Sequence, residues 1–141
     1  MIIHNLLDMM IDPVDIPNEY MPLVEFTHDI YWYMAKFLLP FSERFDLTAS
    51  GIPQRLTFEI DEINEYREHG LYWTDDSHIV IKWRPNAPRK MEDTVIHELT
   101  HLMLVEALSY NPEDDHSPIF FEFIRRFKRF WRKELKNRVR S

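Results

Sequence analysis

The sequence contains no cysteine, and glycine occurs only at positions 51 and 70 of its 141 residues. Without cysteine, the chain forms no disulfide bond, uses no thiol nucleophile and builds no zinc ribbon of the cysteine-ligated type. Two isolated glycines cannot make the glycine-rich loop that holds phosphate groups in many nucleotide-binding proteins. Thiol catalysis and nucleotide binding through such a loop are therefore excluded for this chain.

Long hydrophobic runs are also missing from the sequence. No apolar stretch approaches the roughly 20 residues that a helix needs to cross a bilayer. Residues 1–8 lack the basic start of a signal peptide, and Asp8 interrupts their short apolar run. The lack of a signal peptide and of disulfides predicts an intracellular, cytoplasmic protein with no membrane partner.

Acidic and basic residues are unevenly distributed along the chain. Residues 124–141 hold nine basic residues and one acidic residue, whereas the preceding part holds eight basic and 23 acidic ones. The net charge of −7 therefore conceals a C-terminal segment of +8 and a body of −15. We expect the basic residues within 125–140 to contact an anionic partner, either nucleic acid or the protein's own acidic body.

The length and composition are typical of one globular domain over residues 1–141. Hydrophobic residues make up 45% of the chain and aromatic residues 14%, enough for a single core. Residues 1–18 are expected to be irregular, and apolar residues then recur at helical spacing in three segments. The expected helices are Glu19–Leu39, which Pro40 ends, then Ala87–Tyr110, and then 118–138. The inner face of the last helix is expected to contain Phe120, Phe123, Phe127, Phe130, Trp131 and Leu135.

Three further segments alternate apolar and polar residues, the pattern of half-buried strands. They cover Arg55–Asp61, Gly70–Thr74 and His78–Trp83. The last two segments are separated by the turn residues 75–77 and predict a hairpin, with His78 facing solvent. Together, the helices and strands predict an α+β fold with a small three-stranded sheet.

Residues 97–101, His-Glu-Leu-Thr-His, carry the most specific chemical pattern in the chain. His97 and His101 are four positions apart, so on a helix they lie on one face and can reach one ion from the same side. Zinc accepts imidazole nitrogens at about 2.0–2.1 Å. Glu98 adds a carboxylate beside the first histidine, where it can take a proton from a metal-bound water. This H-E-x-x-H pattern is typical of zinc peptidases.

The residues around this motif predict that it lies on a buried helix. Apolar residues from Val95 to Leu108 give the helix a broad apolar side. Asn86 is expected to cap the N-terminus, Pro88 suits the first turn, and Asn111-Pro112 is a stop signal. The two histidines are therefore expected on a helix and not in a loop.

Three elements of the chain occur in an order that is characteristic of one family. They are the strand 79–81 with residues 84–90, the segment 94–101 that contains the motif, and the segment 116–120, His-Ser-Pro-Ile-Phe. Together they resemble the SprT-like zinc metallopeptidases over about residues 55–130. Ser117 stands where that family often has glycine, and Ile119 where it often has an acidic residue. The resemblance implies a zincin-like fold, in which a strand pair precedes the motif helix and a third zinc histidine begins the next helix.

The resemblance implies that His97, His101 and His116 hold one zinc ion per chain and that Glu98 is the general base. The interval of fifteen residues from His101 to His116 matches the Spartan branch of the family. We prefer His116 as the third ligand because it begins a helix, whereas acidic residues in loops are usually solvated. The residues themselves leave four acidic rivals for that position: Glu106, Asp114, Asp115 and Glu122.

These residues predict a zinc metalloendopeptidase that cleaves protein or peptide substrates through a metal-activated water. The resemblance implies DNA-bound or DNA-crosslinked proteins as substrates. Tyr66, Tyr72 and Tyr110 are candidates for stabilising the oxyanion. Two other functions stay open: a zinc-stabilised, non-catalytic module whose basic C-terminal helix contacts nucleic acid or an acidic partner, and a metal-free interaction domain. Glu98 argues against both, because a structural site has no use for a base beside its ligand.

Overall fold

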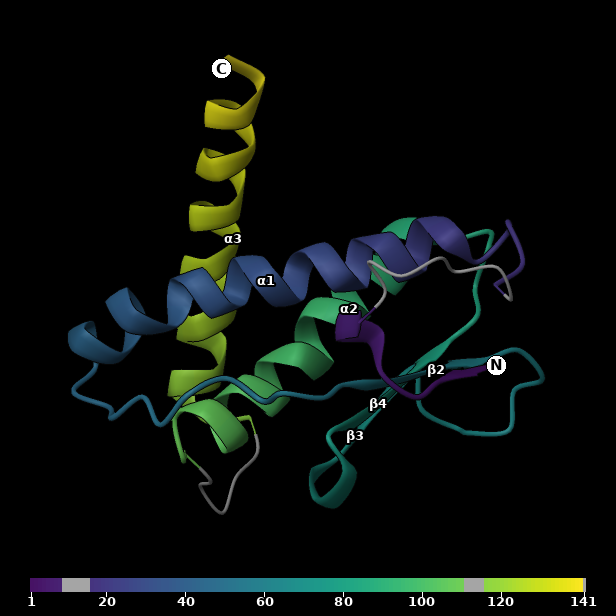
Figure 1. Ribbon diagram of the computed structural model, residues 1–141, viewed down its shortest axis with the longest axis horizontal. Helices are drawn as coiled ribbons and strands as arrows, with labels where there is room; N and C mark the ends of the chain where they lie inside the picture. The colour runs from purple at the N-terminus through teal and green to yellow at the C-terminus, as the bar shows by residue number, and fades with distance from the viewer. Residues whose placement is uncertain (9–15, 111–115, 141) are drawn as a thin grey trace.

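The computed structural model describes residues 1–8, 16–110 and 116–140, which adopt an α+β architecture (Figure 1). Within these ranges, the helices α1, α2 and α3 pack with a small mixed sheet of four strands. The helices cover Met21–Arg44, Pro88–Leu102 and Pro118–Arg140, and the strands β1 to β4 cover Ile2–Ile3, Thr57–Asp61, Gly70–Trp73 and His78–Lys82. No helix in the described ranges has both the length and the apolar character that crossing a bilayer requires.

The four strands are arranged in the order β1-β2-β4-β3. β4 pairs in parallel with β2 and antiparallel with β3, so the expected hairpin is confirmed. Its turn contains a short 3-10 helix, Thr74–Asp76, followed by Ser77 in the left-handed region at a φ of 46°. The expectation of three strands was wrong, because residues 2 and 3 add β1 beside β2. Two residues are too few to show an alternating pattern, so nothing in residues 1–18 predicted this strand.

The outward face of β2 and β4 is more buried than the alternating pattern predicts. His78, expected to face solvent, is only 8% exposed, and its Nε2 lies 2.9 Å from Oε1 of Glu59. The Trp73 ring covers His78 in a stacked arrangement with ring centroids 4.7 Å apart. Asp61 is also buried, and its carboxylate accepts hydrogen bonds from the backbone N–H groups of Glu65 and Tyr66. These polar side chains are buried because they have partners, which a periodicity argument does not detect.

Helix α1 is longer than the sequence predicts, because it continues through Pro40 to Arg44. Proline interrupts the backbone ladder of a helix, and this favoured an end at Leu39. The additional turn is held by tertiary contacts of Phe41, whose ring centroid lies 4.9 Å from that of Phe123 on α3. Aromatic packing between two helices therefore outweighs the local effect of the proline.

The motif helix is shorter than expected and changes geometry near its end. Regular α-helix covers Pro88–Leu102, and Met103–Ala107 continues as a π-helical segment. Pro88 occupies the first turn as predicted, but Ala87 holds the N-cap position without a side-chain bond, so the expected Asn86 cap was wrong by one residue. The predicted stop at Asn111-Pro112 lies outside the described residues, and the helical backbone ends before it.

Helix α3 begins at Pro118, as expected from the sequence, and supplies much of the core. Its residues Phe120, Phe123 and Phe127 are fully buried, and Phe123 and Phe127 both contact Phe37 of α1. The C-terminal turns of α3 extend past α1 (Figure 1). Leu135 in these turns is 36% exposed, so its expected place on the inner face was wrong.

Candidate metal centre

Three histidines, two from α2 and one from the segment just before α3, converge on one point of the described structure. His97 and His101 come from the last two turns of α2, and His116 lies two residues before α3 begins. Their ring centroids are 4.9 to 5.1 Å apart in all three pairs. One ligand atom from each ring lies within 4.8 Å of the others, close enough for the three to bind one metal ion. His97 and His101 lie close together because they are four residues apart on one helix, whereas His116 reaches them because α3 packs against α2.

The three histidine nitrogens fit a cation that prefers tetrahedral coordination, such as zinc. At zinc–nitrogen distances of 2.0–2.1 Å, two ligand atoms of a tetrahedral site lie about 3.3 Å apart. The Nε2 atoms of His97 and His116 are 3.2 Å apart. Burial and the neighbouring His116 lower the pKa of His97, which favours the neutral imidazole that a metal requires. The residues present therefore suit an ion held by three nitrogen ligands.

Phe120 forms the floor beneath the three histidines, a role that the sequence did not suggest. Its fully buried ring has centroid distances of 4.8 Å to His97, 4.4 Å to His101 and 5.1 Å to His116. A single aromatic ring thus restricts the orientation of all three imidazoles. The sequence held one signal for this role. Phe120 lies four residues after His116, near the start of α3, and a spacing of four places two residues on the same side of a helical turn.

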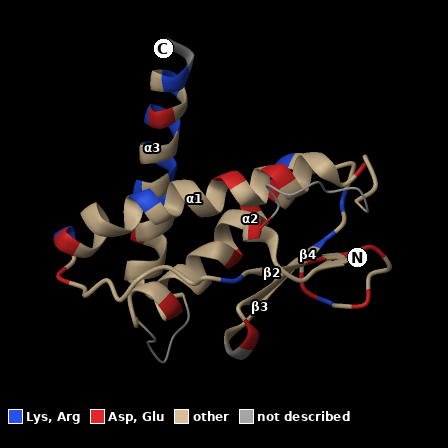
Figure 2. Ribbon diagram, in the orientation of Figure 1, with Lys and Arg blue, Asp and Glu red and all other residues tan. Residues whose placement is uncertain are grey.

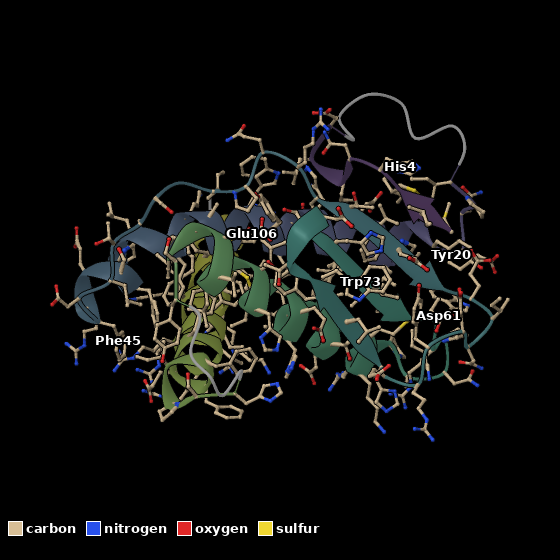
Figure 3. The ribbon with its side chains drawn as sticks, turned by 90° about the horizontal axis from the view of Figure 1, so that it is seen from below. His4, Tyr20, Phe45, Asp61, Trp73 and Glu106 are labelled. Carbon is tan, nitrogen blue, oxygen red and sulfur yellow. The ribbon has the colours of Figure 1, made fainter. Side chains whose placement is uncertain are left out.

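The acidic rivals for the third ligand position do not join this cluster where the structure describes them. Glu106 accepts hydrogen bonds from the hydroxyls of Tyr72 and Ser77. Figure 3 shows Glu106 where the segment after α2 meets the β3–β4 hairpin. Glu122 forms ion pairs of 2.8 Å with Arg125 and Arg126. The other two rivals, Asp114 and Asp115, lie outside the described residues.

Glu98 is a buried carboxyl group directly beside the histidine cluster. Glu98 is only 6% exposed, and this burial raises the pKa of its carboxyl group from 4.5 to about 7. A carboxyl group with this pKa exchanges a proton readily near neutral pH. In the metal-free protein, burial therefore keeps the Glu98 carboxyl group partly protonated near neutral pH.

The backbone of β3 passes directly against Glu98 at Gly70. A Cβ atom at this position would lie 2.9 Å from Oε2 of Glu98 and would overlap the methyl group of Thr94. A larger residue would therefore displace the strand or the carboxylate. Gly70 was placed at a strand start from the sequence, and its close packing against the motif helix was missed. A glycine at the edge of a strand is a known signal for such a close approach.

An open cleft runs between β3 and α2 on both sides of Glu98. One part, of about 280 Å³, is lined by Leu71, Tyr72, Val105 and the three histidines. The other part, of about 320 Å³, is lined by His69, Asp93 and Thr94 together with Gly70, His97 and Glu98. Since β3 is the last strand in the sheet order, its outer edge pairs with no described strand and borders this cleft. The site can thus accommodate an extended chain beside the histidines.

The three tyrosines considered for oxyanion stabilisation lie in different places. Tyr72 lines the cleft beside the histidines. The hydroxyl of Tyr110 lies 3.1 Å from Oγ of Ser117, and the ring of Tyr66 packs edge-on against Trp73 on the outer part of the sheet. Of the three, Tyr72 is the one that lines the cleft with the histidine cluster.

Comparisons with protein-family models, with curated proteins and with solved structures find no match for this chain. What points to a function is the chemistry of the site. That chemistry consists of three convergent imidazoles, one buried carboxyl group and a cleft along a strand edge that no described strand covers.

Proposed function

We propose that the protein is a zinc-dependent metallopeptidase that resembles the SprT-like family in its fold and its site. It would act inside the cell on protein or peptide substrates, including proteins bound or crosslinked to DNA. The observation that carries this proposal is the convergence of His97, His101 and His116 next to Glu98 in one cleft. The motif helix beside a small sheet with an open edge supports a zincin-like arrangement.

His97, His101 and His116 would hold one zinc ion per chain. When bound, zinc acidifies a water molecule towards a pKa of about 7 and polarises a peptide carbonyl group. The three neutral imidazoles leave the ion its positive charge, and Phe120 beneath them limits how far the rings can turn.

Glu98 is the general base in this proposal. It accepts a proton from the attacking water as the carbon–oxygen bond forms, and it donates that proton to the amine nitrogen as the carbon–nitrogen bond breaks. Burial raises its pKa to about 7 in the metal-free protein, and a zinc ion beside it would lower the pKa and favour the ionised form that accepts the proton. The side chain is buried against Gly70 and Thr94, so its position is held before a substrate arrives.

The edge of β3 is the proposed docking strand for the substrate. An extended peptide can add to an open strand edge through main-chain hydrogen bonds, which hold it with little dependence on its sequence. Tyr72 lies on β3 and lines the part of the cleft that contains the histidines. Its hydroxyl donates its one proton to Glu106, so Tyr72 would serve as oxyanion donor only by turning that hydroxyl from Glu106 to the substrate.

The test combines zinc content with hydrolysis of an unfolded protein substrate. We expect about one zinc per wild-type chain and measurable cleavage. Glu98→Gln should keep the zinc and lower cleavage by about 10²- to 10⁴-fold, because the base is lost and the ligands remain. Glu92→Gln, on the same helix but outside the cleft, should change neither quantity. Zinc-loaded wild type without cleavage, or a Glu98→Gln variant that cleaves normally, would contradict the proposal.

A further inference from the structure

A groove between α1 and α3 lies outside the metal cleft and has no part in the proposed peptidase reaction. Its volume is about 330 Å³, and Phe37 and Phe41 from α1 and Phe130 from α3 form its apolar floor. Four basic residues line its sides: Arg44, Arg126, Arg129 and Lys133. Positive charge therefore surrounds an apolar floor on both helices.

Three of these four cations are not neutralised within the described chain. Arg126 pairs with Glu122 and lies over the Phe45 ring at 5.2 Å. Arg44, Arg129 and Lys133 are exposed and form no ion pair with a described residue. Unpaired like charges around an apolar groove favour an occupant that brings negative charge and an apolar side chain.

The aromatic floor is better suited to a protein segment than to nucleic acid. Single-stranded nucleic acid binds through bases that stack on open aromatic faces. Phe37 and Phe41 are buried, and their rings pack against each other and against α3. The groove thus offers a recess for an aliphatic side chain and few free ring faces for bases.

The loop between β2 and β3, residues 62–69, has the complementary chemistry. Ile63 is 80% exposed, the largest exposed fraction among the large apolar side chains of the described residues. Glu65 and Glu68 follow it, against one basic residue, Arg67, in the same loop, whereas Glu62 is already paired with the N-terminal amino group at 2.7 Å. The Asp61 carboxylate holds the backbone of the loop at 2.9 and 3.1 Å, so its shape exists before any contact is made.

We propose that loop 62–69 of one copy docks in the α1–α3 groove of a second copy. Ile63 fills the apolar recess, and Glu65 and Glu68 face Arg44, Arg129 and Lys133. The loop and the groove lie at opposite ends of the molecule's long axis (Figure 1), so one chain cannot make this contact with itself. Figure 2 shows acidic residues at the loop end and basic residues along α3. The contact is heterologous, joining two different surfaces head to tail.

The test follows self-association by sedimentation and light scattering over a series of protein concentrations. A contact made by one loop is small and weak, so high concentrations are included. We expect wild type to associate at low salt and to dissociate as salt screens the exposed charges. Ile63→Ser and the double variant Arg129→Glu/Lys133→Glu should each weaken association by about tenfold or more.

Mixing the two variants provides the sharpest measurement. The Ile63→Ser chain keeps an intact groove, and the Arg129→Glu/Lys133→Glu chain keeps an intact loop, so a mixture should form a 1:1 complex. This result would also show that both variants are folded. Lys136→Glu on the same helix, outside the groove, and the conservative Ile63→Leu should associate like wild type.

Three results would overturn the proposal. The first is a wild-type protein that stays monomeric at every concentration and salt. The second is association that neither variant weakens or that their mixture does not restore. The third is an oligonucleotide that binds wild type but not the Arg129→Glu/Lys133→Glu variant, when that variant also self-associates as strongly as wild type. This result would make the groove a nucleic-acid site. None of these results depends on whether the protein is a peptidase.

Discussion

Histidine has two contrasting environments in this molecule, one at the metal centre and one on the outer face of the sheet. His97, His101 and His116 converge on one another over the Phe120 ring. His78 instead meets the Glu59 carboxylate at 2.9 Å beneath the Trp73 ring. A histidine paired with a carboxylate is satisfied within the protein. Three converging imidazoles repel one another when protonated, so their arrangement is favourable when they are neutral and share a cation.

The largest expected effect separates the two environments by their zinc binding. His101→Ala should weaken zinc binding by more than about 100-fold, because it removes a direct ligand and even outer partners of ligands contribute 10- to 100-fold. His78→Ala should leave zinc binding unchanged. Competition with a zinc chelator measures both affinities. Equal zinc affinities in the two variants would remove the distinction between ligand and structural histidine.

A second prediction concerns the zinc-free protein and the buried Glu98. Its folded-state pKa of about 7 lies above its ordinary value of 4.5. The folded state therefore holds a proton that the unfolded chain releases, and this contribution to stability is present below pH 4.5 and lost as the pH rises through about 7. For each pH unit between these two pKa values, the unfolding free energy falls by about 1.4 kcal/mol.

Glu98→Gln removes this dependence because glutamine does not ionise. Relative to wild type, the variant should gain about 3 kcal/mol of unfolding free energy between pH 4 and pH 8. Urea unfolding with chelator present measures this difference, and Glu92→Gln on the same helix is the control. A difference between variant and wild type that stays constant with pH would show that Glu98 is not buried as described.

The smallest predicted effect tests the structural pair. Glu59→Ala leaves His78 buried without its carboxylate partner, which should lower the unfolding free energy by about 1–3 kcal/mol. Zinc affinity and cleavage should stay at wild-type values, because the pair lies on β2 and β4 and outside the residues that line the cleft. Thermal unfolding beside a zinc titration provides both readouts. A loss of zinc with unchanged stability would contradict a purely structural role.

Sequence reasoning succeeded where a local spacing decides the geometry. His97 and His101 lie together because of helical periodicity, and the β3–β4 hairpin forms where turn residues separate two alternating segments. It failed at Pro40, where interhelical aromatic contacts extend α1, and at His78, where a partner from a parallel strand allows burial. In both failures, the deciding residue is distant in sequence.

The amino-acid sequence alone therefore determined the α+β composition of the fold, the pair of histidines on one helix face and the carboxylate beside them. Periodicity and capping act over one or two turns, so a reader of the sequence can use them. Only the tertiary structure decided that His116, and not Glu106 or Glu122, completes the cluster. It also decided that Gly70 brings the edge of the sheet against Glu98. Both results depend on how α3 and β3 pack against α2. Contacts between residues far apart in the sequence determine this packing, and local sequence patterns do not predict it.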